Sequence, residues 1–316
     1  LACGTGDLAR QLAERVGADG QVLATDYAPA MVSLAAAALI NDPQASTAVV
    51  DAAATGLAPE SYSAVICAMG LMFLPDPTAA LKDWRRVLVP GGRLAIAVWA
   101  GPGDNLWVAS LGMSAAMNGL AVGGPPTGPG GLFSLSDPEV LAQAATDAGF
   151  TDVHIDQTPL SFRYGSTDEH FDIVSSLAGP LATLLASARQ EQRDAVRATC
   201  AELLCGQVAT DGSLRLAGLA LILSARASPG PAPPNGSRTA HPGCAWLRRA
   251  SRCWWPAAAG RSASGRAAPL PRRTVRYSGA IQAIIGRSLA PTTSIGCSAP
   301  SLRCRAISGP PASSSA

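Results

Sequence analysis

The chain has 316 residues, enough for one large domain or two small ones, and its formal net charge at pH 7 is only +2. That small total conceals two regions of opposite charge. All 22 acidic residues lie in residues 1–226 with half of the basic ones, whereas residues 227–316 contain 12 Arg and no Asp or Glu. The basic residues that could bind nucleic acid are therefore concentrated in the tail, where no acidic residue balances them.

The cysteines do not follow a metal-binding or disulfide pattern. There are eight, none forms a C-x-x-C pair, and half of them lie in the basic tail. We expect Cys3 and Cys67 to be buried free thiols in a reducing cytoplasm, and we expect no metal site. The first residue is Leu and stands where a strand should already be running, so we expect a fragment that lacks its N-terminus.

The first nine residues indicate a strand end, a glycine turn and the start of a helix. Gly4 and Gly6 remove the Cβ atoms that would keep a ligand away from the backbone. Their spacing, with Asp26 twenty residues beyond Gly6, fits a dinucleotide-binding pattern. Asp7, however, places a carboxylate in the first helical turn, where a pyrophosphate would bind. The turn therefore favours a nucleoside without phosphates that carries a positive charge, such as S-adenosylmethionine.

Helices and strands alternate along the first hundred residues, which predicts crossover connections and a parallel sheet. The strands are apolar runs without polar alternation, so both faces of the sheet should be covered. We predict helices at 7–16, 29–40 and 78–89, strands at 22–26, 48–51, 62–67 and 93–99, and a turn at 90–92.

The next region contains a long uncharged stretch, residues 105–122, within Gly- and Pro-rich sequence. Ser110, Ser114 and Asn118 recur every fourth residue and would form a polar stripe on a helix, so a cap helix is favoured over a membrane span. A capping box at Ser136 should open a helix that ends near Gly149. Strands are predicted at 152–157 and 214–225, and helical insertions at about 101–136 and 160–205.

Residues 227–316 are rich in Arg, Pro, Ala and Ser and lack a helical or strand period. Such a composition predicts a disordered tail. It is also typical of coding DNA translated in the wrong frame, and an arm that binds nucleic acid through Arg and Trp is a further, less favoured interpretation.

Several motifs together resemble those of class I S-adenosylmethionine-dependent methyltransferases, in the ubiquinone/menaquinone-biosynthesis-like (methyltransferase type 11) branch. The likeness covers about residues 1–226. It rests on residues 2–6 (Ala-Cys-Gly-Thr-Gly), 26–28 (Asp-Tyr-Ala), 51–52 (Asp-Ala), 70–76, 86–94 (Arg-Val-Leu-Val-Pro-Gly-Gly-Arg-Leu) and 133–135 (Phe-Ser-Leu). The resemblance implies an α/β, Rossmann-like fold with a seven-stranded, mostly parallel sheet, one reversed strand and helices on both faces. In this chain the first strand would be truncated.

The resemblance also implies a role for each motif in binding S-adenosylmethionine. Cys3, Gly4 and Gly6 would approach its methionine part, and Asp26 would accept hydrogen bonds from both ribose hydroxyls. The remaining expected cofactor contacts are Tyr27 and Met31 beside the adenine, Asp51 and the backbone of Ala52 at its amino group, and Ala68 beneath it.

The expected reaction is transfer of the methyl group to a small-molecule acceptor by in-line displacement, driven by proximity and desolvation. Trp99, Trp107 and Phe133 could line the acceptor pocket or belong to the core. No catalytic residue is assigned; His154 should point away from the core, and His170 could overhang the pocket.

The sequence departs from the family pattern in three places. The upstream part of the first strand, with its usual acidic residue, is absent; Ser63 stands where relatives usually carry Asp, and Ala68 where many carry a polar residue. Because the missing strand start could disrupt the central strand of the sheet, an inactive or non-enzymatic nucleoside-binding protein is the alternative. An NAD-dependent oxidoreductase is disfavoured because Lys82, the sole lysine, has no Tyr partner of the catalytic kind near it in sequence. We expect a cytoplasmic protein with no membrane span.

Overall fold

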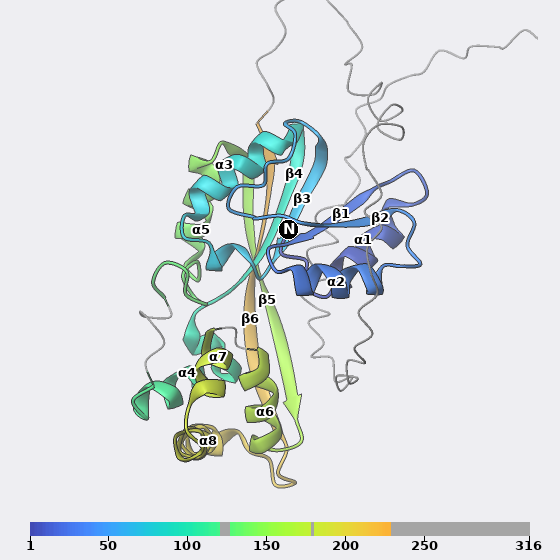
Figure 1. The fold of residues 1–316 in the computed structure, drawn as a ribbon. Coiled ribbons are helices and arrows are strands. Elements are labelled where there is room, and N and C mark those ends of the chain that lie inside the picture. The colour runs from blue at the N-terminus through green and yellow to red at the C-terminus, as the bar shows by residue number, and fades with distance from the viewer. Residues whose placement is uncertain (121–126, 178–179, 229–316) are drawn as a thin grey trace, which may run out of the picture.

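The computed structural model describes residues 1–120, 127–177 and 180–228. The predicted tail, apart from its first two residues, lies outside the described residues, as does part of the stretch predicted to form the cap helix. The described residues form a mixed sheet structure with flanking helices, as the predicted Rossmann-like fold requires (Figure 1).

The N-terminal elements alternate as predicted. They are α1 (Asp7–Val16), β1 (Val22–Asp26), α2 (Pro29–Ala38) and β2 (Ala45–Val49). Strands β1 and β2 pair in parallel, and both helices pack against this two-stranded sheet (Figure 1). The cluster of buried apolar side chains in this part is small and is formed by Ala9, Ala24 and Leu39. The contribution of apolar burial to its stability is correspondingly small.

A four-stranded sheet carries most of the core. Its order is β3 (Tyr62–Ala68), β4 (Leu88–Trp99), β6 (Leu214–Ala227) and β5 (Phe150–Tyr164). Strand β6 runs antiparallel to both neighbours, whereas β3 and β4 are parallel, so the predicted single reversed strand is present. Helices α3 (Pro77–Val87) and α5 (Pro138–Asp147) pack against each other and against this sheet (Figure 1).

The two sheets are joined by the first three residues. The amino group of Leu1 donates to the carbonyl of Ile66 in β3 at 2.8 Å, and the amide of Cys3 donates to the carbonyl of Thr25 in β1 at 2.8 Å. The described residues therefore hold six strands, and the predicted count of seven is not confirmed. The stretch expected as a first strand makes too few backbone hydrogen bonds to either side to form a ladder.

Four helices gather at the far end of β5 and β6 (Figure 1). They are α4 (Leu106–Met117), α6 (Thr167–Leu177), α7 (Pro180–Ser187) and α8 (Gln190–Leu204). The polar stripe of α4 faces α8: Ser110 and Ser114 are fully buried, and the amide of Asn118 donates to the hydroxyl of Thr199. Hydrogen bonds to neighbouring groups compensate for the burial of these polar atoms. Among the described residues, no helix has both the length and the apolar character needed to cross a bilayer.

Several local predictions differ from the structure. The strand predicted at 48–51 is β2 at Ala45–Val49, and the helix predicted at 78–89 ends at Val87, where β4 begins. The turn at 90–92 is a bulge inside β4, where the pairing jumps from Leu88 to Arg93. Strand β5 continues to Tyr164 because it pairs with β6 along its whole length; Pro159 is tolerated because β5 is an edge strand. The cap of α5 is Asp137 rather than Ser136, since its carboxylate accepts from the amide of Glu139.

Candidate cofactor site

The predicted cofactor residues lie where chain segments leave the carboxyl ends of parallel strands. Asp26 is the last residue of β1, Asp51 follows β2 by two residues, and Ala68 is the last residue of β3. The glycine turn follows the three residues that lie between β1 and β3. This edge of a parallel sheet is where open α/β folds bind their ligands.

The glycine turn is built from left-handed backbone. Gly4 and Gly6 have φ of 53° and 89°, and Ala2 before them also has a positive φ. A Cβ at Gly4 would meet no atom within 4 Å, so this position leaves open space beside the backbone. A Cβ at Gly6 would lie 3.1 Å from the Cα of Ala35 in α2. Gly4 therefore offers room for a ligand, whereas Gly6 also allows α1 and α2 to approach each other.

Asp26 connects the turn to the end of β1. One carboxylate oxygen accepts from the amide of Gly4 at 2.9 Å, and the other accepts from the amide of Ala28 at 3.0 Å. Asp26 is not the N-cap of α2, because that position is Ala28 and no side chain caps the helix. A carboxylate has about four acceptor positions, so each oxygen can accept a further hydrogen bond. The geometry suits the two hydroxyls of a ribose.

Apolar side chains next to Asp26 are unusually exposed. Tyr27 is 74% exposed, Met31 is 39% exposed, and Val49, the residue paired with Asp26 across the small sheet, is 54% exposed. Asp51 is exposed nearby and accepts from the amide of Ala53 at 2.8 Å. Exposed apolar surface beside polar groups is typical of a ligand site. Sequence reasoning missed Val49, which only the strand register places here.

The thiol of Cys3 lies close enough to Asp26 to be influenced by its charge. Partial burial, followed by the negative charge of Asp26, raises the pKa of the Cys3 thiol. Cys3 is half-buried rather than buried as predicted, whereas Cys67 is fully buried and its pKa is raised by burial. Both thiols are free and remain protonated at neutral pH, so neither is prepared as a nucleophile.

The segment after β3 packs tightly against the residue before the glycine turn. Met69 has a φ of 58°, and a Cβ at Gly70 would lie 2.6 Å from the Cβ of Ala2. Ala68 itself is half-buried at the end of β3. Gly70 was not identified from sequence as a site residue, and only the tertiary contact reveals why a side chain cannot be placed there.

The predicted acceptor side contains an aromatic cluster. The rings of Trp99 and Trp107 lie 5.1 Å apart edge to face, and Phe162 stacks on Trp107 at 4.3 Å. The three side chains are at most 5% exposed and belong to the core. Phe133 is also buried, and the hydroxyl of the following Ser134 donates to the carbonyl of Met72 at 2.7 Å.

Asn105 fixes this cluster and was missed by sequence reasoning. Its side-chain amide donates to the carbonyls of Ala100, Gly101 and Leu219, and its oxygen accepts from the amide of Leu219 and from the indole of Trp107. The residue is fully buried. A single Asn before a helix gives no sequence signal that it will be buried and bonded both to β6 and to the residues that follow β4.

The two described histidines have different environments. His154 is exposed on β5, as predicted. His170 is fully buried, its Nε2 lies 2.6 Å from the carbonyl of Trp107, and burial lowers its pKa below the ordinary value of 6.5. Within residues 1–120, 127–177 and 180–228, no group of three or more His, Cys, Asp or Glu is arranged to hold a metal ion.

In comparison with known proteins, the N-terminal part of the chain is similar to methyltransferases. Residues 1–92 match the family model described as a methyltransferase domain. This region contains the glycine turn, Asp26, Asp51 and Ala68. The predicted resemblance to class I S-adenosylmethionine-dependent methyltransferases of the ubiquinone/menaquinone branch is confirmed for this part of the chain, and its extension to residue 226 stays a prediction.

Two similar curated proteins carry names of that branch. A 2-phytyl-1,4-naphtoquinone methyltransferase of Thermosynechococcus vestitus is 40% identical over 102 residues, which are 32% of this chain and 45% of the relative. A ubiquinone/menaquinone biosynthesis C-methyltransferase UbiE of Neisseria meningitidis is 36% identical over 97 residues, which are 30% of this chain and 40% of the relative. The chain thus spans less than half the length of these relatives.

Among solved structures, the YcgJ protein from Bacillus subtilis is similar with a TM-score of 0.49 and 15% identity. The match covers 72% of this chain and 90% of that one.

Proposed function

We propose that this protein binds S-adenosylmethionine at the glycine turn and Asp26 and transfers its methyl group to a small-molecule acceptor. Residues 1–226 would form the transferase unit, and helices α4 and α6–α8 would form its cap. The match of residues 1–92 to a methyltransferase domain supports the reaction class. The names of the similar proteins support a quinone-type or related small aromatic acceptor.

The observation that carries the proposal is the pair of hydrogen bonds that hold the Asp26 carboxylate. Because the amides of Gly4 and Ala28 orient both oxygens, the carboxylate is fixed before any ligand arrives. A fixed acceptor loses little conformational entropy when it binds a ribose, and this preorganisation increases affinity. The open space at Gly4 allows the ligand to approach the backbone.

The residues at the site fit a sulfonium nucleoside better than a dinucleotide. Asp7 lies in the first turn of α1, is exposed, and accepts from the hydroxyl of Thr5 at 2.9 Å. Its negative charge would repel a pyrophosphate at the helix N-terminus and would attract a cationic group. The exposed faces of Tyr27 and Met31 offer apolar contact to a base.

When bound, S-adenosylmethionine would supply an activated methyl group that an in-line displacement can transfer without a protein nucleophile. The chain's own contribution would be to orient the two reactants and exclude water. Correct positioning can lower the barrier by about 7–11 kcal/mol. Trp99, Trp107 and Phe133 are buried in the core, so they would support the acceptor side from within the core and would not contact the acceptor directly. An already acidic acceptor carbon would need no general base, and none is assigned.

Calorimetric titration tests the proposal directly. We expect the full chain to bind S-adenosylmethionine and S-adenosylhomocysteine and to show no affinity for NAD. A screen of quinol, phenol and carboxylate acceptors, followed by S-adenosylhomocysteine release, would then identify the acceptor class. Absence of affinity for both sulfur nucleosides, or comparable affinity for NAD, would contradict the proposal.

A further inference from the structure

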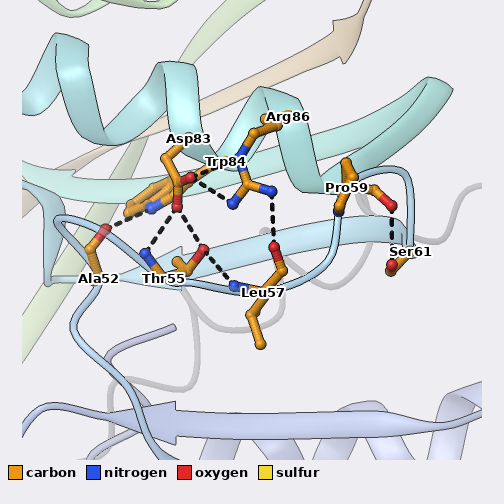
Figure 2. Close-up of polar contacts among 8 residues, drawn as sticks. All are labelled: Ala52, Thr55, Leu57, Pro59, Ser61, Asp83, Trp84 and Arg86. Atoms are coloured by element: carbon orange, nitrogen blue, oxygen red, sulfur yellow. Dashed lines mark hydrogen bonds and ion pairs between the residues drawn. The ribbon is translucent and has the colours of Figure 1, made fainter.

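The loop between β2 and β3, residues 50–61, is fastened to helix α3 at three points (Figure 2). This loop contains Asp51 and Ala52, which the resemblance to methyltransferases predicts at the adenine amino group. Helix α3 has no predicted contact with the cofactor. The residues of α3 that hold the loop therefore contact the loop and not the ligand itself.

The first point is the indole of Trp84. This side chain is fully buried in the main core, and its Nε1 donates to the carbonyl of Ala52 at 2.8 Å. A buried indole whose N–H found no acceptor would carry a desolvation penalty of about 1–3 kcal/mol. Trp84 thus fixes the carbonyl group of Ala52, the residue that follows Asp51.

The second point is the carboxylate of Asp83, which connects the loop to an arginine. One of its oxygens accepts from both the amide and the hydroxyl of Thr55, and the other accepts from the guanidinium of Arg86 at 2.6 Å. Thr55 is only 7% exposed. Partial burial raises the pKa of Asp83, but the hydrogen bonds from Thr55 and Arg86 outweigh this effect, so the pKa of the carboxyl lies below its ordinary value.

The third point is Arg86, which bridges the helix and the far end of the loop. Its guanidinium donates to the carbonyl of Leu57 at 2.7 Å as well as to Asp83. The backbone continues the attachment, because the amide of Glu60 donates to the carbonyl of Arg86. Figure 2 shows these contacts running side by side along α3 from Ala52 to Leu57.

Asp51 itself has only local support. Its carboxylate accepts from the amide of Ala53, and its carbonyl accepts from the amide of Ala54. The side chain is exposed. The residue before it is held to β1, because the amide of Val50 donates to the carbonyl of Asp26, and the residue after it is held to α3 by Trp84. The attachment to α3 therefore fixes one side of Asp51.

We propose that Asp83 and Trp84 are positioning residues for the adenine-binding loop. They would set the affinity for the adenosine part of the cofactor, and the base selectivity, by holding residues 51–57 against α3. This inference rests on the proposed function and adds to it residues that touch no cofactor atom. A carboxylate that orients a neighbouring ligand-binding group acts as supporting structure for the site.

The test measures the Kd for S-adenosylhomocysteine of Thr55→Val, Asp83→Asn and Thr55→Ser and compares each with that of the unaltered chain. Valine removes the hydroxyl bond to Asp83 and preserves side-chain volume, whereas serine keeps the hydroxyl. We expect Thr55→Val and Asp83→Asn to raise the Kd for S-adenosylhomocysteine by about tenfold, the equivalent of one hydrogen bond. Thr55→Ser should restore affinity to within about twofold of the original.

The second ligand in the titration is S-inosylhomocysteine, in which an oxygen replaces the adenine amino group. Loss of loop positioning should raise its Kd by no more than about twofold, because that ligand lacks the amino group that Asp51 would recognise. The matched control is Asp172→Asn in α6, which also removes a carboxylate from an arginine, here Arg197, at 2.7 Å. This variant should leave both dissociation constants unchanged.

Equal losses for the two ligands would overturn the inference, and so would the same loss in Asp172→Asn. If Asp83→Asn does not fold, Thr55→Val with serine rescue decides the question by itself. A chain that binds neither ligand before any substitution would overturn the proposed function and this inference together. A chain that binds S-adenosylhomocysteine but is insensitive at positions 55 and 83 would overturn the inference alone.

Discussion

Substitution of Asp26 by asparagine tests the site most directly. The change removes the negative charge and replaces one of the two acceptor oxygens by an amide donor. In the native structure these oxygens accept from the amides of Gly4 and Ala28 at 2.9 and 3.0 Å. Whichever oxygen is replaced, one backbone N–H then faces a donor, and one of the proposed ribose bonds is lost.

The expected magnitude follows from the number of bonds lost. A hydrogen bond to a charged group contributes about 1.5–3 kcal/mol. Loss of one ribose bond should therefore raise the Kd for S-adenosylhomocysteine by about 10- to 150-fold. The free energy of unfolding should fall by a smaller amount, because Asp26 is only partly buried and water can satisfy the freed amide.

Isothermal titration of Asp26→Asn with S-adenosylhomocysteine provides the measurement, and Asp137→Asn is its control. Asp137 also accepts a backbone hydrogen bond, from Glu139 at 2.8 Å, but it caps α5 and lies outside the proposed site. Asparagine caps helices nearly as well as aspartate, so this control should behave like the unaltered chain. A change below twofold at position 26 in a folded variant would refute the assignment of the ribose site.

Three further outcomes are expected. Gly218→Ala should destabilise the chain by about 1–3 kcal/mol in urea denaturation, because the new Cβ would lie 2.6 Å from the ring of Phe162. Gly112→Ala is the control and should not destabilise the chain, because its Cβ would meet no atom within 4 Å. Burial lowers the pKa of His170, so the unfolded chain binds more protons than the folded chain between pH 6.5 and the lowered pKa. The free energy of unfolding should therefore fall as the pH drops through this range, and His170→Gln should weaken that dependence. An unchanged pH profile in the variant would contradict this role of His170. Added S-adenosylhomocysteine should slow amide hydrogen exchange in β1 and β2 more than in β4 and β6, since the small sheet has the smaller core; uniform protection would contradict the binding site.

The sequence predicted the first half of the fold well because its signals are local. The helical spacing that begins at Asp7 and the apolar run that ends at Asp26 gave elements whose bounds match α1 and β1. Both elements depend on neighbouring residues only. The positive φ of Gly4 and Gly6 is likewise a local property, because glycine has no side chain. The prediction was poorer for β5, whose length is set by its pairing with β6 and not by its own pattern.

The candidate site shows the same division. Asp26 and Asp51 could be named from their places at strand ends, and the roles proposed for them still await the binding experiments. Val49, Gly70 and Asn105 could not be named, because their environments depend on strand register, on a close approach to Ala2 and on hydrogen bonds to β6 and to the segment after β4. The ring that stacks on Trp107 belongs to Phe162, which is 55 residues away in sequence, and no local pattern predicts that contact.

The sequence by itself determined the order of strands and helices, the glycine turn and the acidic residues at the strand ends, because period, backbone freedom and charge are properties of short segments. Only the tertiary structure decided that the Asp26 carboxylate is held by Gly4 and Ala28, that α3 holds the loop after β2, and that His170 is buried. These depend on which distant segments share a small volume, and that choice is made by the packing of the whole core.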